Sequence, residues 1–319
     1  MSFSGNVKNE LSRQDCPARH CQIAELAAIL GFCGLVSSRQ GGQLSLKIFT
    51  ENVTVARKVF TLVQKTFNIV ACVSVKRNMN RRSVSYLIVV TRPQDVLRIL
   101  KATKRIQEDG SSPKEDRLVN PLITGRICCR RAFLRGTFLC VGSMSNPGKA
   151  YHFEIVCNRV TAANQVCDLI CSFGMDAKVV PRKKTYVVYL KEGSQIVDIL
   201  NIMEAHIALM ELENIRILKE VRNSINRKVN CETANISKTV SAAVKQVKDI
   251  EYLRDTIGLE RLPAGLEEIA LMRLTYPEAT LKELGELVTP RVGKSGVNHR
   301  LRKLSEITEK VRQKQGGAL

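Results

Sequence analysis

An internal duplication constrains the fold of this chain more than any other feature. The segments 25–67 and 131–170 carry the same succession of patterns: a glycine-containing helix, a turn, a strand and a second helix. Ile48 pairs with Ile155 at an offset of 107 residues. A chain of 319 residues is expected to form about two domains, and the repeat predicts that one of them consists of two related halves.

Each copy predicts the element order helix, strand, strand, helix, strand, strand, helix. The later elements are the strands and closing helices at 69–75, 83–90, 95–103, 177–180, 185–190 and 195–202. We therefore expect an α+β N-terminal domain over residues 1–213, with pseudo-symmetric αββαββα halves at about 20–106 and 126–207. Gly31 and Gly136, offset by 105 residues, are expected to occupy equivalent places and to permit close contact between paired helices.

The C-terminal third of the chain has a different pattern, because strand signals stop at Glu211. Residues 214–232 are basic and rich in asparagine, and we expect them to form a linker. The apolar residues between Ile236 and Ile250 then recur at intervals of three and four, which predicts an amphipathic helix. We expect residues 233–319 to form a separate all-α domain.

The segment 280–304 is typical of a helix-turn-helix. Thr280 and Glu283 form the signature of a capping box that begins a short helix. Gly285 stands where a crossing helix requires a small side chain, and 289–293 predicts a turn about two residues longer than the tightest version of the motif.

The second helix of this motif carries polar and basic side chains suited to reading a DNA duplex. Asparagine can bond an adenine edge with both amide atoms, arginine can bond guanine, and serine or lysine can bond phosphate. A solvated basic helix in a structural bundle is the alternative interpretation. The candidate DNA-binding residues are Arg291, Lys294, Ser295, Asn298, His299, Arg300, Arg302 and Lys303.

The charge of the whole chain favours an anionic partner. Lys and Arg number 50 against 30 Asp and Glu, which gives a formal net charge of +20. Double-stranded DNA is the leading partner and an acidic membrane surface the second, although no apolar stretch is long enough to span a membrane. The basic hairpin tips and the linker supply candidate phosphate contacts: Lys76, Arg77, Arg81, Arg82, Arg182, Lys183, Lys184, Arg227 and Lys228. The alternative interpretation is that these residues are merely solvated.

The eleven cysteines are expected to be reduced thiols in a cytoplasm, because their number is odd and no export signal precedes them. Cys16 and Cys21 with Cys128 and Cys129 would supply four zinc ligands, but their spacing is not that of usual zinc sites. We therefore expect structural thiols, no metal and no cofactor. Neither His152 nor His206 stands in a pattern typical of a catalytic base.

Three segments carry a resemblance to a known family: 134–139, 230–236 and 294–300. They resemble the WhiA family of Gram-positive bacteria, and the similarity covers essentially the whole chain. The resemblance implies a transcription regulator with an N-terminal fold like that of LAGLIDADG homing endonucleases and a C-terminal helix-turn-helix. It also implies a nucleoid-associated protein with roles in cell division, chromosome segregation and, in spore-formers, sporulation.

The residues themselves argue against nuclease activity. In homing endonucleases of this type, carboxylates at the ends of the signature helices hold the metal ions that activate water. The signature reads L-A-G-L-I-D-A-D-G. When its first glycine is aligned on Gly31, its two acidic positions fall on Gly34 and Val36; when it is aligned on Gly136, they fall on Leu139 and Val141. Because none of these side chains binds a hard cation, we expect no enzyme. The rival hypothesis is an adaptor that contacts the transcription or division machinery, or another regulator, with DNA contact secondary.

Overall fold

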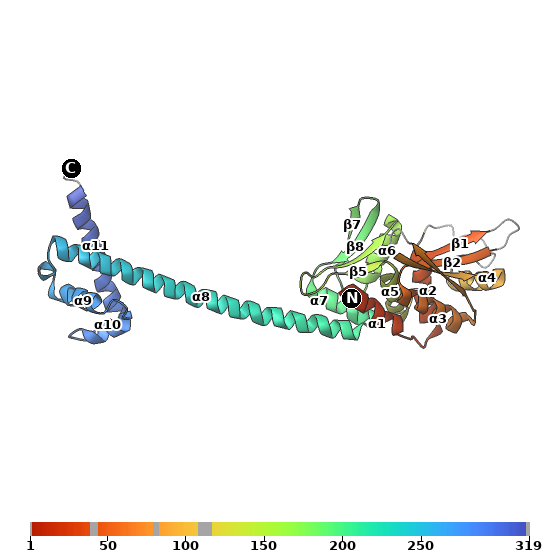
Figure 1. The fold of residues 1–319 in the computed structure, drawn as a ribbon, viewed down its shortest axis with the longest axis horizontal. Coiled ribbons are helices and arrows are strands. Elements are labelled where there is room, and N and C mark those ends of the chain that lie inside the picture. The colour runs from red at the N-terminus through yellow and green to blue at the C-terminus, as the bar shows by residue number, and fades with distance from the viewer. Residues whose placement is uncertain (1, 39–43, 79–82, 108–116, 317–319) are drawn as a thin grey trace. The chain divides into compact units, whose positions relative to one another are not determined.

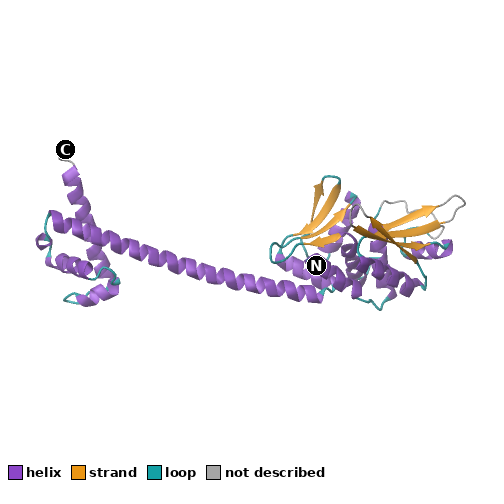
Figure 2. Cartoon of the chain, viewed as in Figure 1, coloured by secondary structure: helices purple, strands orange, loops and turns teal. Residues whose placement is uncertain are grey.

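The computed structural model describes residues 2–38, 44–78, 83–107 and 117–316. The chain forms two compact units, Met1–Glu220 and Val221–Leu319 (Figure 1). Within the described residues, all strands belong to the first unit (Figure 2). None of the described helices combines the length and the apolar character that crossing a membrane requires.

The first unit repeats one succession of elements twice, as the duplication predicts. The first half comprises α2 (Arg19–Cys33), β1 (Gly34–Ser38), β2 (Leu44–Thr50), α3 (Val53–Phe67), β3 (Cys72–Asn78), β4 (Ser83–Val90) and α4 (Pro93–Ala102). The second comprises α5 (Ile127–Val141), β5 (Gly142–Met144), β6 (Phe153–Cys157), α6 (Val160–Cys171), β7 (Lys178–Arg182), β8 (Thr185–Leu190) and α7 (Gly193–Met203). The predicted α+β fold class, with two αββαββα halves, is confirmed.

One helix of the first unit was not predicted. Helix α1 (Phe3–Arg13) precedes the repeat and buries Phe3, Val7 and Leu11 in the core that both halves share. These three residues recur every four positions, which is the spacing of one helical face. The Ser2 side chain caps the helix by accepting from the Gly5 N–H at 3.1 Å. The periodicity covers only three apolar positions, so the pattern in the sequence is weak.

The two antiparallel sheets have the same order, β1-β2-β4-β3 and β5-β6-β8-β7. Their register corrects the alignment of the halves. Gly34 pairs with Ile48, whereas Gly142 pairs with Ile155, so Gly34 corresponds to Gly142 at an offset of 108. Gly136 therefore corresponds to Ala28, and its predicted equivalence with Gly31 was wrong. The segment from Gly142 to Ile155 is one residue shorter than the segment from Gly34 to Ile48, which glycine spacing alone did not reveal.

Helices α2 and α5 cross in close contact at the centre of the first unit. A Cβ atom added to Gly136 would lie 2.5 Å from the Glu25 carbonyl oxygen and 3.0 Å from the Ala28 Cβ. At Gly31 the added atom would instead meet the Leu118 side chain at 2.7 Å. The small residues at the crossing are therefore Ala28 and Gly136, and the two helix backbones touch through them.

A buried ion network lies beside this crossing. The Glu25 Oε1 atom is 3.5 Å from Lys58 Nζ and 3.5 Å from Arg135 Nε. Arg135 Nη1 also donates to Glu204 Oε2 at 2.6 Å. Burial raises the pKa of the Glu25 carboxyl, while the charges of Arg135 and Lys58 lower it. Because removal of one partner would leave a buried charge unpaired, the network fixes α2, α3 and α5 in one arrangement.

Helix α8 (His206–Thr256) begins in the first unit and ends in the second. The segment 214–232, expected to be a linker distinct from the following helix, lies within it. The segment contains neither proline nor glycine, so nothing in it ends a helix. The amphipathic pattern from Ile236 does not bury its first members, since Ile236 and Val240 are exposed and Ile250 is the first to be buried.

The rest of the second unit is helical. After the 3₁₀ turn Leu259–Arg261 follow α9 (Ala264–Thr275), α10 (Leu281–Leu287) and α11 (Lys294–Gly316). The last two helices lie where the helix-turn-helix was predicted. Their common core with α8 and α9 consists of Ile250, Leu253, Leu259, Leu262, Leu266, Ile269, Ala270, Leu284, Val288, Val297, Leu301 and Leu304.

The crossing predicts the effect of adding one methyl group. Replacement of Gly136 by alanine should destabilise the first unit by about 1–3 kcal/mol, because α2 and α5 must separate to admit the Cβ. Gly125→Ala is the matched control, since its Cβ would have no neighbour closer than 3.7 Å. Urea unfolding followed by circular dichroism measures both variants. Equal stability of the two variants would contradict close contact at Gly136.

Candidate nucleic-acid interface

A complete capping box determines where α10 begins. The Glu283 N–H donates to Thr280 Oγ1 at 3.3 Å, and the Thr280 N–H donates to Glu283 Oε2 at 2.7 Å. Hydrogen bonds from the Thr280 backbone and side chain to the ionised carboxylate hold the pKa of Glu283 below its ordinary value. The pair satisfies two N–H groups that would otherwise lack partners, so the helix begins directly after Thr280.

The turn after α10 folds back onto Gly285. The Val292 N–H donates to the Gly285 carbonyl at 3.0 Å, and a Cβ on Gly285 would lie 2.0 Å from the Val292 oxygen. The same atom would lie 3.2 Å from Val297 Cγ2 in α11. A side chain at position 285 would therefore clash chiefly with the backbone of the turn and, to a lesser degree, with the crossing helix α11, which was the expected reason for a small residue there.

Helix α11 is fixed to the second unit along its apolar face. Val297, Leu301 and Leu304 are buried at one-turn intervals. Further along, Thr308 Oγ1 donates to the Asp249 carbonyl at 3.3 Å, while Arg312 lies 3.2 Å from the carboxylate of the same residue. These contacts determine which side of α11 faces solvent.

The exposed side of α11 carries most of the predicted reading residues. Arg291 is exposed in the turn before the helix, and six of the predicted residues are exposed on the helix itself: Lys294, Ser295, Asn298, His299, Arg302 and Lys303. Arg302 lies 3.8 Å from Glu306. Both side chains are exposed, so this ion pair contributes little to the stability of the fold. The structure thus gathers amide, imidazole, hydroxyl and cationic groups on one solvent-facing side at the start of a helix.

Arg300 differs from the other candidates. It is half-buried, and its Nη1 donates to the Gly265 carbonyl at 3.3 Å. The guanidinium therefore connects α11 to the first turn of α9. Its geometry supports a role in positioning α11, and the exposed residues beside it remain the candidates for DNA contact.

The candidate phosphate contacts of the first unit lie on the equivalent edge strands β3 and β7 and in the turn that follows β7. Val73 pairs with Ile88 and Val179 with Val188, so Lys76 corresponds to Arg182. All the described members of this set in the first unit are exposed, and Arg182 lies 3.6 Å from Glu154. Arg81 and Arg82 lie outside the described residues. The exposed set comprises Lys76, Arg77, Arg182, Lys183 and Lys184, together with Arg227 and Lys228 on α8.

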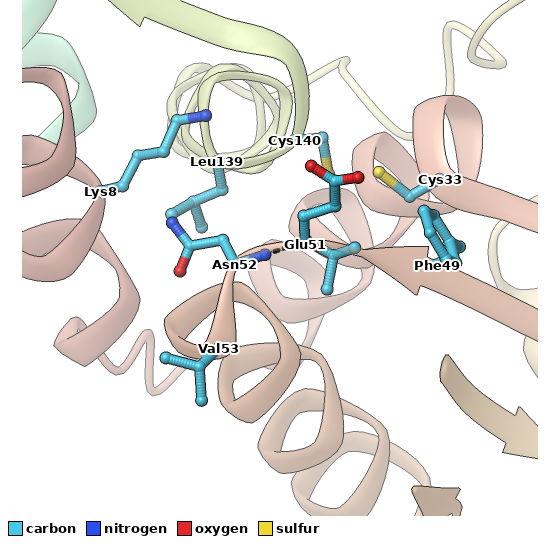
Figure 3. A pocket seen from close by; sticks show the side chains of 9 residues that line it. Lys8, Cys33, Phe49, Glu51, Asn52, Val53, Leu139 and Cys140 are labelled. Carbon is cyan, nitrogen blue, oxygen red and sulfur yellow. Dashed lines mark hydrogen bonds between the residues drawn. The ribbon is translucent and has the colours of Figure 1, made fainter. Parts of the chain in front are cut away.

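The C-terminal ends of α2 and α5 border a pocket of about 570 Å³ (Figure 3). With the corrected offset, the motif's acidic positions in the first half are Gly31 and Cys33, so their assignment to Gly34 and Val36 was wrong. In the second half, the acidic positions of the motif still fall on Leu139 and Val141. None of the four is acidic, and Glu51 is the one carboxylate among the described residues that line the pocket.

Two thiols and an amine also face this pocket. Burial lowers the pKa of Lys8, whereas a hydrogen bond between Cys33 and Cys140 lowers the pKa of the first thiol and raises that of the second. These groups do not form the paired oxygen donors that a hard divalent cation requires. The described part of the pocket therefore lacks the chemistry of metal-dependent phosphodiester cleavage.

A different cluster lies at the N-terminal ends of the same helices. The His20 Nδ1 atom is 3.2 Å from the Cys129 sulfur and 3.2 Å from the Cys21 sulfur. With Cys128, these donors all lie within 4.8 Å of one another. The sequence separation of the pairs argued against a common site, but the offset of 108 relates His20 to Cys128 and Cys21 to Cys129.

The predicted histidines outside this cluster have other surroundings. His152 Nε2 lies 3.2 Å from Glu154 Oε2 on the second sheet. His206 is exposed at the first residue of α8. The partner of the His152 ring is thus a carboxylate, which also accepts from Ser143 Oγ at 2.8 Å.

Comparison with known protein families matches three consecutive parts of the chain. Residues 19–105 match the WhiA N-terminal LAGLIDADG-like domain, and residues 130–222 match the WhiA LAGLIDADG-like domain. Residues 225–308 match the WhiA C-terminal HTH domain. The matched segments correspond to the two halves of the repeat and to the helical region that contains α10 and α11.

Similar proteins span the full length of the chain. A probable cell division protein WhiA of Lachnoclostridium phytofermentans is 54% identical, over 98% of this chain and 100% of that protein. The protein of the same name from Alkaliphilus oremlandii is 50% identical, over 98% of each chain. The crystal structure of full-length DUF199/WhiA from Thermatoga maritima shares the fold, with a TM-score of 0.59, 23% identity and coverage of 97% of this chain and 99% of that one.

Proposed function

The chain belongs to the WhiA family, and from this premise we propose that it is a sequence-specific DNA-binding transcription regulator. The observation that carries the proposal is the exposed side of α11, where polar and basic residues follow a capped helix and a tight turn. The N-terminal part of such a helix enters the major groove, and its first turns reach base edges. Double-stranded DNA is the partner that this chemistry fits.

The residues on α11 divide into base contacts and phosphate contacts. Asn298 offers a donor and an acceptor to an adenine edge, and Arg302 offers a two-pronged donor to guanine. His299 adds a donor or acceptor beside them. In this proposal Arg291, in the turn, and Lys294, at the start of the helix, bind phosphates and set the register on the duplex.

The basic residues of the first unit supply sequence-independent affinity in this proposal. Lys183 and Lys184 are exposed at one hairpin, and Lys76 and Arg77 lie near the end of the equivalent edge strand. Cations on such strands attract the phosphate backbone and release its counterions. If these residues are instead solvated and do not contact DNA, their removal should leave the salt dependence of binding unchanged.

The same proposal includes no nuclease activity. Two-metal cleavage requires acidic ligands at the ends of the signature helices, and this chain has Cys33 and Val141 at those ends. The relatives are named for cell division, which supports a regulatory role in that process. Roles in chromosome segregation and sporulation, and association with the nucleoid in the cytoplasm, belong to the same proposal and rest on the family resemblance.

Replacement of Asn298 or His299 by alanine should reduce discrimination between a selected operator and random DNA. Each good base contact contributes about 1–3 kcal/mol of discrimination, so the ratio of the two affinities should fall roughly 5- to 150-fold. The operator is first selected from a random duplex pool with the full chain, and the affinities are then measured by fluorescence anisotropy. Lys310→Ala, exposed two turns beyond Lys303, is the control that leaves the ratio unchanged. An unchanged ratio in both test variants would favour the adaptor hypothesis.

The double variant Lys183→Ala and Lys184→Ala should weaken binding to operator and random DNA alike. Each lost phosphate contact should reduce the slope of log affinity against log salt by about 0.9, because fewer counterions are released. Lys149→Ala, another exposed lysine of the first unit, should leave the slope unchanged. If the double variant also keeps the original slope, the hairpin lysines are solvated and do not contact DNA.

A further inference from the structure

The first turns of α2 and α5 place four soft donors around one point. His20 and Cys21 are the second and third residues of α2, and Cys128 and Cys129 are the second and third residues of α5. Because the two helices are related by the duplication, the site contains the same two positions from each half. Cys21 and Cys129 are buried, while His20 and Cys128 are exposed.

We propose that His20, Cys21, Cys128 and Cys129 bind one zinc ion. Three thiolates and one imidazole are a donor set typical of structural zinc sites, in which four protein ligands surround the metal tetrahedrally. The same set is too soft for magnesium or calcium, which select oxygen ligands. The site is therefore chemically distinct from the metal centre of a nuclease.

The distances between the four donor atoms are close to those of a tetrahedral zinc site. Zinc–sulfur bonds of about 2.3 Å and zinc–nitrogen bonds of about 2.0 Å place tetrahedral ligands roughly 3.5–3.8 Å apart. The His20 Nδ1 atom already lies 3.2 Å from each of the Cys21 and Cys129 sulfurs, and all four donors lie within 4.8 Å. These separations differ from the tetrahedral range by about 1 Å at most, which small side-chain rotations would remove.

Burial and the neighbouring thiols raise the pKa of the Cys21 and Cys129 thiols, so a bound ion would take the place of their protons. The cluster lies in the first turns of α2 and α5, at the positive ends of the two helix dipoles. Arg126 is the residue before α5 and acts electrostatically on the Cys129 thiol. These positive groups offset the net negative charge that three thiolates leave on a divalent ion.

The packing around the cluster also fits a structural ion. Cys21, Ala24, Cys129 and Ala132 form a small buried cluster, and Cys16 is half-buried against it. This cluster is separate from the main core. An ion there would fasten the N-terminal ends of α2 and α5, while their crossing at Gly136 fixes the middle.

Metal content of the full-length protein tests the proposal. Protein produced with zinc in the medium, purified under reducing conditions and desalted, should contain one zinc per chain by mass spectrometry of the dissolved metal. His20→Ala and Cys128→Ala should each lose most of this zinc. Both side chains are exposed, so these variants should still fold, and circular dichroism checks this. Cys72→Ala and Cys231→Ala, two exposed cysteines elsewhere, are matched controls that should retain one zinc.

Cobalt substitution adds a readout of the ligand set. The cobalt-loaded protein should show the intense visible bands of a tetrahedral thiolate site, and the Cys128→Ala variant should lack them. Chelation of zinc should lower the melting temperature of the wild-type chain and leave that of Cys128→Ala unchanged. Zinc content equal in the wild type and both test variants, or a Cys21–Cys129 disulfide in place of bound metal, would overturn the proposal.

Discussion

The close crossing of α2 and α5 is the contact on which the first unit depends. Gly136 and Ala28 bring the helix backbones together, and the buried network of Glu25, Lys58 and Arg135 fixes their neighbours. Each helix then ends at a glycine that starts the first strand of its own sheet. One contact therefore orders two pseudo-symmetric halves, and it also defines two separate sites, one at each end of the helix pair.

These two ends have different chemistry. At the C-terminal ends, Cys33 and Val141 stand at the positions where the nuclease motif has metal-binding acids, and the described residues that line the pocket there do not supply the paired oxygen donors for a catalytic cation. At the N-terminal ends, histidine and cysteines form a set of soft donors. The helix pair thus serves as a structural frame, and the residues proposed to read bases lie on α11 in the second unit.

Much of this organisation follows from the sequence because its signals are local or repeated. The duplication predicts both αββαββα halves, and Thr280 with Glu283 predicts the start of α10. The errors have physical reasons. The spacing of Gly31 and Gly136 could not align the halves, because Gly31 stands three residues before Gly34 at the end of α2, whereas Gly136 stands six residues before Gly142 at the end of α5. A basic, asparagine-rich composition suggested a linker at 214–232, but without glycine or proline the helix continues. The clustering of His20 with Cys129 required the crossing itself.

The central claim is that α11 reads DNA bases, whereas the first unit binds the phosphate backbone of DNA without cleaving it. Site-specific photo-crosslinking tests this most directly, with a photoreactive amino acid in place of His299 in one full-length sample and of Lys183 in another. On a selected operator duplex, the probe at 299 should crosslink to bases at one defined step, and the probe at 183 should give no crosslink to a defined base. A base-specific crosslink from 183, with none from 299, would contradict the account.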